Sequence, residues 1–195
     1  MISRKFEVDT CIRFPGHLLM QNSQPGPGTS FRPDPVTLLH IDPSIGKGTA
    51  KTSDVAANHL ALRDRNFQWL TYSPGYISHV PLMHDVLTGP MSGCRLVVFR
   101  LNGVVQSGHL GTVSGYDDVN TAINQTWGNW AQAHQADVIV GFNPLRDWAG
   151  TIPPQNGKID GSNPSLFGLI TAGHNHLYTI WTYPVLNSPN TMRIY

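Results

Sequence analysis

The sequence predicts an α/β or α+β fold with a β-sandwich at its centre. Short runs of β-branched and aromatic residues recur along the chain, so about eight or more strands are expected. Only about two segments show the spacing of apolar residues that is typical of a helix. Charged residues make up 13% of the sequence, and glycine (19) and proline (15) are frequent, which disfavours long exposed helices.

The size and charge of the chain limit its organisation and its partners. Its 195 residues suffice for one sizeable core, so we expect a single domain over residues 1–195. The net charge is +1 without a basic run, so neither nucleic acid nor an anionic membrane surface is expected as a partner. No apolar stretch is long enough for a membrane span or a signal peptide. We expect a monomer.

Cysteine usage indicates the cellular compartment. Cys11 and Cys94 are the two cysteines of the sequence, and a chain of this size without a disulfide framework is typical of a reducing compartment. We therefore expect the protein in the cytoplasm of the producing cell, or exported by a route that needs no cleaved signal. Cys11 has no histidine at a recognisable spacing, and we interpret it as a small core residue.

The first half of the chain predicts mainly strands. They are expected over residues 6–14, 36–42, 67–72 and 76–82. Residues 21–35 are rich in Pro, Gly and Ser and predict a loop. Ser53 and Asp54 are suited to begin a helix, which we expect to continue to about residue 65.

The second half contains the clearest helix. Asp117 and Asp118 begin it, and its apolar stripe consists of Val119, Ala122, Ile123, Trp127 and Trp130. Strands are expected over residues 137–142, 166–171 and 177–185. The long loop over residues 143–165 contains Trp148, which could contact a protein substrate or anchor the loop in the core. His174 and His176 could bind a metal, but a polar turn explains them better, and we expect no metal site.

The other strands surround the segment from residue 88 to residue 109. Residues 95–101 and 104–109 have strand composition, and Asn102-Gly103 between them is typical of a two-residue hairpin turn. In that register Leu96 faces His109 and Cys94 faces Gly111. Cys94 and His109 then share one face as diagonal neighbours, at roughly 7–8 Å or somewhat less.

A thiol and an imidazole at this distance suffice for nucleophilic catalysis. The imidazole takes the thiol proton, and the thiolate is the reactive species. The alternative is that Cys94 is an inert buried thiol and His109 a structural histidine. His79 and His84 could replace His109 as the base, but no register argument places either beside Cys94.

The segment TGPMSGC, from Thr88 to Cys94, resembles the active-site signature of the glutamine-deamidase toxins, such as the Burkholderia lethal factor and the catalytic domain of cytotoxic necrotizing factor. In this family a Leu-x-Gly-Cys motif carries the nucleophile, and in some members a threonine six residues earlier completes a triad with a histidine. Thr88, Cys94 and His109 match these positions. Met91 stands in place of the usual leucine, a volume-conserving difference.

The resemblance implies mixed sheets packed as a sandwich with a few peripheral helices, and hydrolysis of a protein glutamine side-chain amide to glutamate. Cys94 would be the nucleophile, His109 the general acid and base, and Thr88 the residue that orients His109. Backbone N–H groups of Gly93 and Cys94 would bind the oxyanion. No cofactor is implied.

Relatives in this family modify Rho-type GTPases or a translation-initiation helicase. The resemblance therefore implies a host protein as the substrate and delivery into the host cytosol. Two alternatives remain open. The first is a thiol acyltransferase such as a transglutaminase, which passes the same thioester to an amine. The second is a β-rich binding module without enzymatic activity, in which Cys94 is inert.

Overall fold

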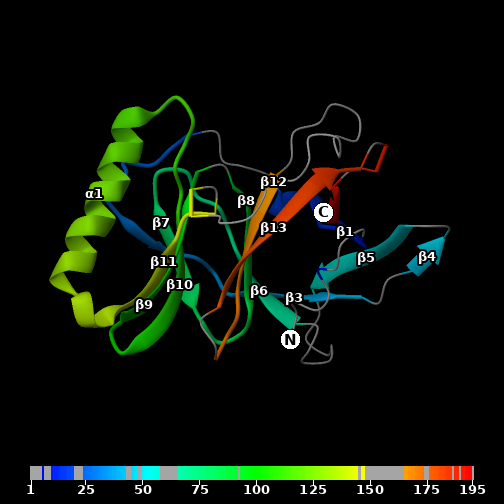
Figure 1. The fold of residues 1–195 in the computed structure, drawn as a ribbon, viewed down its shortest axis with the longest axis horizontal. Helices are drawn as coiled ribbons and strands as arrows, with labels where there is room; N and C mark the ends of the chain where they lie inside the picture. Colours follow the sequence, from blue (N-terminus) through cyan, green and yellow to red (C-terminus); the bar gives the residue numbers. More distant parts are fainter. Residues whose placement is uncertain are drawn as a thin grey trace.

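Figure 1 shows a computed structural model of the chain. The structure describes residues 6, 10–19, 24–42, 45–47, 50–57, 66–91, 93–144, 146–147, 165–173, 176–185, 187–188 and 190–194. Trp148, His174 and most of the expected loop over residues 143–165 lie outside these residues. The described part is mostly β-strand, in two mixed sheets, with one α-helix. This makes it an α+β fold with a β-rich core.

The larger sheet closes into a barrel. Its strands, in spatial order, are β1 (Thr10–Arg13), β14 (Thr191–Ile194), β13 (Leu177–Pro184), β12 (Ser165–Ile170), β8 (Val86–Met91), β6 (Asn66–Leu70), β3 (Thr37–Ile41), β5 (Ala50–Ala57) and β4 (Ile45–Lys47). In addition, β1 pairs in parallel with β5 from Thr10 opposite Lys51 to Arg13 opposite Asp54. This pairing joins the two ends of the sheet, with β4 attached outside the ring.

The expectation of a central β-sandwich is therefore wrong in its detail, and two strands explain the difference. Ser53 and Asp54 were expected to begin a helix, but residues 50–57 form β5. Ser53 and Val55 are buried while Asp54 is partly exposed, the two-residue alternation of a strand. Pairing with β3 and β1 outweighs the fair helical pattern of the sequence. The sequence also did not predict β14, and β5 and β14 both belong to the ring.

The smaller sheet carries the helix. Its strands, in spatial order, are β11 (Val138–Phe142), β9 (Arg95–Leu101), β10 (Val104–Leu110), β7 (Ile77–Pro81) and β2 (Phe31–Pro33). One face packs against α1 (Asp117–Ala133), where Ile123 and Trp127 meet Phe99. The other face packs toward β8 and β12 of the barrel, where Leu96 and Leu166 belong to one buried cluster.

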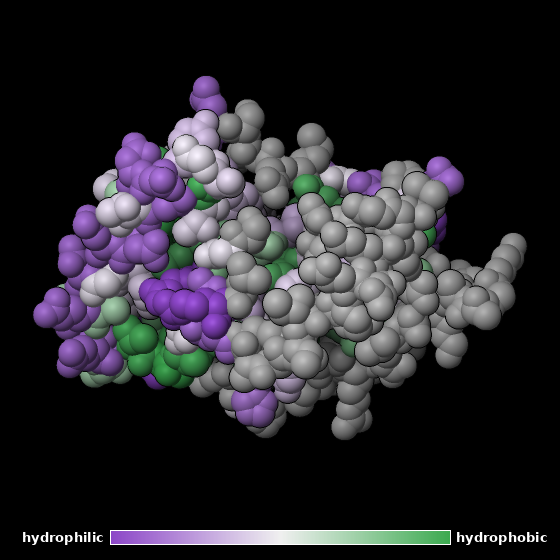
Figure 2. Space-filling model, turned by 45° about the horizontal axis from the view of Figure 1, so that its top comes forward, coloured by the Kyte–Doolittle hydropathy of each residue, from purple (hydrophilic) through white to green (hydrophobic). Residues whose placement is uncertain are grey.

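The helix is the expected one, with Asp117 and Asp118 in its first turn, where their charge favours the positive end of the helix dipole. Two short 3-10 turns, Gly16–Leu18 and Gln135–Asp137, complete the helical elements of the described residues, so the few peripheral helices that were expected reduce to one α-helix here. Figure 2 shows hydrophilic residues over the outer side of α1, at the left. None of the described helices combines the length and the apolar character needed to cross a membrane.

Candidate active site

The β9–β10 hairpin has the register that the sequence predicted. Leu101 lies opposite Val104, and Leu96 lies opposite His109. The two turn residues, Asn102 and Gly103, have φ values of 49° and 81°, which a two-residue type I′ turn requires. The prediction of this turn is confirmed, and it fixes which side of the sheet His109 occupies.

Cys94 and His109 project toward the barrel. Cys94 and Leu96 belong to the cluster between the two sheets, whereas Leu110 packs on the opposite face against α1. Since facing residues share a side of a sheet, His109 lies on the side of Leu96. Cys94 itself follows β8 and precedes β9, so it lies where the chain passes from the barrel to the smaller sheet.

Thr88 reaches His109 from the other sheet. It lies in β8 of the barrel, opposite Gly168 of β12 and Leu70 of β6. Its Oγ1 is 2.7 Å from Nδ1 of His109, and both side chains are fully buried. The expected hydrogen bond between these two residues is confirmed. It fixes the orientation of the imidazole ring.

The environment of His109 determines its protonation. Burial lowers the pKa of His109 to about 3, so the ring is neutral at neutral pH. The tautomer with its proton on Nδ1 donates to Thr88 Oγ1 and keeps a lone pair on Nε2. Within the described part of the chain, Nε2 is buried and has no hydrogen-bond partner. The oriented neutral ring therefore has a lone pair that can accept a proton, although its low pKa makes it a weaker base in this buried state than a free imidazole.

Thr112 contacts Cys94, and Tyr72 contacts both Thr112 and His109. Thr112 Oγ1 donates to Cys94 Sγ at 3.5 Å, and the thiol lies 3.8 Å from Thr112 O. Tyr72 donates its hydroxyl proton to Thr112 O at 2.7 Å, and its ring centroid is 5.3 Å from that of His109. Burial, and secondarily the charge of Cys94, raises the pKa of Tyr72 to about 12. The phenol therefore remains a donor at neutral pH.

Asn143 contacts the residue before the thiol. Its Nδ2 donates to Gly93 O at 3.2 Å. Gly93 has a φ of 92°, a left-handed conformation that favours glycine. Sequence reasoning did not find Asn143, Tyr72 or Thr112. The hairpin register alone could have indicated Thr112, because it follows the residue expected to face Cys94.

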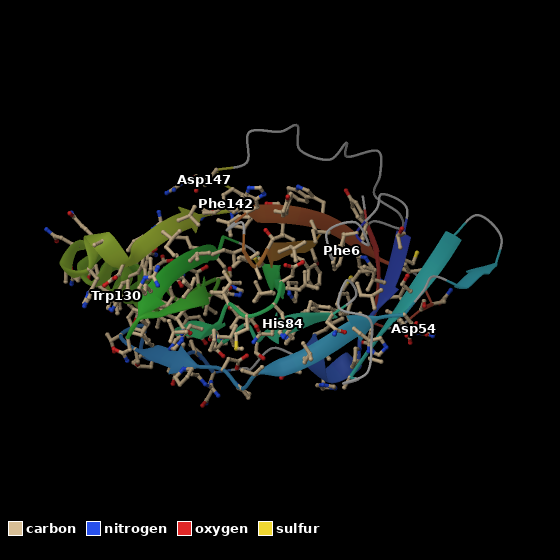
Figure 3. The ribbon with its side chains drawn as sticks, turned by 90° about the horizontal axis from the view of Figure 1, so that it is seen from below. Phe6, Asp54, His84, Trp130, Phe142 and Asp147 are labelled. Carbon is tan, nitrogen blue, oxygen red and sulfur yellow. The ribbon has the colours of Figure 1, made fainter. Side chains whose placement is uncertain are left out.

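The two alternative bases lie elsewhere. His79 Nδ1 is 3.1 Å from Gln106 Oε1, and its ring packs against Phe31 and Phe99 on the helix side of the sheet. His84 precedes β8 whereas Cys94 follows it, and a strand of this length spans roughly 17 Å. Figure 3 likewise shows His84 well apart from Phe142, which pairs with Leu96. Neither histidine lies beside the thiol.

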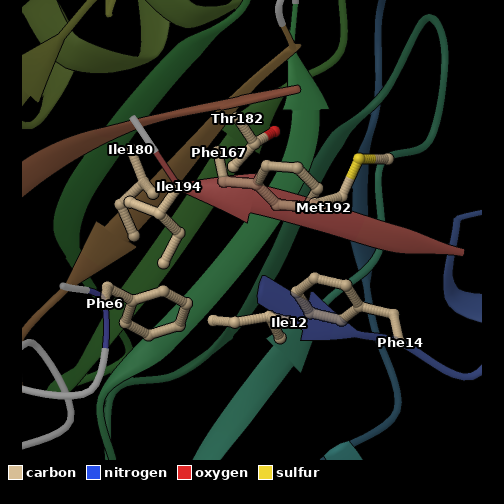
Figure 4. A pocket seen from close by; sticks show the side chains of 8 residues that line it. All are labelled: Phe6, Ile12, Phe14, Phe167, Ile180, Thr182, Met192 and Ile194. Carbon is tan, nitrogen blue, oxygen red and sulfur yellow. The ribbon is translucent and has the colours of Figure 1, made fainter. Parts of the chain in front are cut away.

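Two further features give no support for a site. His176 is exposed, and the described residues contain no group of three or more His, Cys, Asp or Glu side chains that could hold a metal ion. A cavity inside the barrel has a volume of about 10 Å³ and is shown in Figure 4. Its lining is almost entirely apolar: Phe6, Ile12, Phe14, Phe167, Ile180, Thr182, Met192 and Ile194. A space of this size holds about one water molecule, so we interpret it as a packing gap.

Comparisons with known proteins found no family model and no curated protein sequence that matches this chain. The candidate site therefore depends on its own geometry. That geometry places the hydroxyl of Thr88 2.7 Å from the imidazole of His109, on the side of the sheet where the thiol of Cys94 also lies. All three side chains are buried, with 1% of Cys94 and 0% of His109 and Thr88 exposed.

Proposed function

We propose that this protein hydrolyses the side-chain amide of glutamine in a partner protein. One observation carries the proposal: the 2.7 Å hydrogen bond between Thr88 Oγ1 and His109 Nδ1. A base and the residue that orients it are joined by such a bond in a catalytic triad. Here the two bonded residues are ones that match the signature of the deamidase toxins. Cys94 lies on the same side of the sheet as His109.

The reaction has two stages. Nε2 of His109 accepts the thiol proton while Sγ of Cys94 attacks the carboxamide carbon, and the resulting oxyanion is held by the backbone N–H groups around Gly93 and Cys94. His109 then returns its proton to the leaving nitrogen, ammonia departs, and a thioester remains. Water attacks the thioester, releases glutamate and restores the thiol. The residues need no metal or organic cofactor for these steps.

The substrate is proposed from the resemblance alone. A host protein such as a small GTPase or a translation-initiation helicase would present the glutamine. Delivery into the host cytosol belongs to the same proposal. A transglutaminase-like acyltransferase shares the first stage and differs only in that an amine replaces water.

A second candidate has one observation in its favour. Only 1% of Cys94 is exposed, which is also typical of an inert structural thiol, so the chain could be a binding module without enzymatic activity. The rate of thiol alkylation separates the two. An activated Cys94 reacts much faster than Cys11 with iodoacetamide, whereas slow and equal labelling of both cysteines favours the binding module.

The decisive experiment tests for the activity and identifies the substrate at the same time. A host-cell lysate is incubated with the wild-type protein or with Cys94→Ser, and its proteins are analysed by mass spectrometry. Conversion of a specific glutamine to glutamate by the wild type alone supports deamidation. Glutamine crosslinked to an amine indicates the acyltransferase, and identical lysates argue against both enzymes.

A further inference from the structure

Asn143 lies outside the proposed triad and contacts the peptide group that precedes Cys94. It follows β11, which pairs with β9 up to Phe142 opposite Leu96. This pairing brings Asn143 beside the start of β9. There its Nδ2 donates to Gly93 O across 50 sequence positions. In Figure 3, Phe142 and Asp147 mark this edge of the smaller sheet.

The side chain of Asn143 is held in one orientation by its own loop. Its Oδ1 accepts the N–H of Arg146 at 2.9 Å, and its backbone N–H donates to Asp147 Oδ2 at 2.8 Å. Asp147 is held in turn by Arg146, with 2.8 Å between Nε and Oδ1. Because Oδ1 is committed to Arg146, the amide cannot flip without losing that bond. Nδ2 therefore faces Gly93 O.

The bond to Gly93 O fixes a peptide plane beside the thiol. In a trans peptide the C=O of one residue and the N–H of the next point in opposite directions. Holding the carbonyl of Gly93 toward Asn143 therefore turns the N–H of Cys94 away from Asn143. The N–H of a nucleophilic residue is a common oxyanion donor in acyl-transfer enzymes, and its direction decides whether it meets the developing charge.

We propose that Asn143 is a positioning residue that sets the oxyanion-binding N–H of Cys94 through its hydrogen bond to Gly93 O. This role rests on the proposed function, because it concerns the acylation of Cys94. Asn143 acts on the peptide group alone. It should therefore matter for attack on a carbonyl, where an oxyanion forms, and not for alkylation, where none forms.

The test compares these two reactions of the same thiol. p-Nitrophenyl acetate acylates Cys94: Sγ bonds to the acetyl carbon, p-nitrophenolate leaves, and water later releases acetate. Iodoacetamide alkylates Sγ with loss of iodide. Asn143→Asp keeps the size and the Oδ1 acceptor but replaces the donor with a carboxylate that repels Gly93 O, and Asn143→Ala removes the side chain. Asn124→Asp is the matched control, because Asn124 Nδ2 also donates to a backbone carbonyl, that of Asn120, on the exposed side of α1.

We expect Asn143→Asp and Asn143→Ala to lower the acylation rate by about 10- to 100-fold, part of the effect of losing an oxyanion donor. The fall should appear in kcat rather than KM, with alkylation within about twofold of the wild type and with Asn124→Asp unchanged. Unchanged acylation overturns the inference while the proposed function stands. An equal fall in both reactions also overturns it, since the variants then act on the thiol or the fold. If wild-type Cys94 is not acylated faster than the Cys94→Ser background, the proposed function fails and the inference with it.

Discussion

Thr88 and His109 are joined by a hydrogen bond of 2.7 Å that crosses from the barrel to the smaller sheet. Neither side chain is exposed, so water does not compete for the bond. The orientation of the proposed base is therefore a property of the packing between two sheets.

Cys94→Ser should abolish deamidation, by about 10³-fold or more, because serine lacks the readiness of a thiol to ionise. Cys11→Ser is the control. Cys11 is buried in β1, opposite Arg193 of β14, and its substitution should leave kcat unchanged. The measurement is ammonia release or glutamate formation on the substrate found in the lysate. Near-normal turnover by Cys94→Ser would exclude a thiol mechanism.

Thr88→Val should lower kcat by roughly tenfold or more, a part of the 10²–10⁴ that an oriented base contributes. Valine keeps the shape of threonine but leaves Nδ1 of His109 buried without its partner, which should also cost about 1–3 kcal/mol of stability. Thr88→Ser retains the hydroxyl and should be much milder. Steady-state kinetics and urea unfolding measure the two effects, and equal tolerance of valine and serine would reduce Thr88 to a packing residue.

His109 should make the protein less stable in acid. Its pKa falls from 6.5 to about 3 on folding because of burial, so between these pH values the unfolded chain binds a proton that the folded protein does not. The free energy of unfolding therefore falls as the pH decreases through this window, by about 3 kcal/mol at pH 4. Urea unfolding of the wild type and of His109→Gln between pH 7 and pH 4 isolates this contribution. Parallel pH profiles of the two proteins would contradict it.

Two substitutions of glycine by alanine should change the free energy of unfolding in opposite directions. A Cβ added at Gly103 or at Gly128 meets no atom within 4 Å, so only the backbone distinguishes them. Gly103 has a φ of 81° in the hairpin turn, and alanine there should cost about 1–2 kcal/mol. Gly128 lies inside α1, where alanine should add up to about 1 kcal/mol. Thermal unfolding compares the two variants, and a stabilising Gly103→Ala would contradict the role assigned to the turn.

The parts of the site that the sequence predicted are those with local signals. Asn102-Gly103 specifies its own turn type, and the two-residue period of a strand then places His109 opposite Leu96. Thr88 lies on another sheet, so no periodicity relates it to His109. It was assigned from the resemblance to the deamidase signature, and their hydrogen bond bears out the pairing but not the catalytic role.

The parts that the sequence did not predict depend on long-range pairing. Tyr72, Thr112 and Asn143 converge on the segment around Cys94 from three different places in the fold. The hairpin register alone could have indicated Thr112, and nothing in the residues next to Tyr72 or Asn143 marks their place. The same holds for the barrel. A helix was expected from residue 53 to about residue 65, but residues 53–57 belong to β5, where pairing with β1 and β3 outweighs the helical pattern, and residues 58–65 lie outside the described part. Local propensity cannot indicate that a sheet closes.

The position of β1 in the barrel has a consequence for biosynthesis. β1 lies between β5 and β14, and Cys11 pairs with Arg193, near the other end of the sequence. β14 must therefore emerge from the ribosome before the ring can close. Until then, the edge of β1 that pairs with β14 is unpaired. Contacts this distant in sequence slow folding, and an open edge invites association with other chains. The protein is therefore most open to association with other chains before β14 has been synthesised.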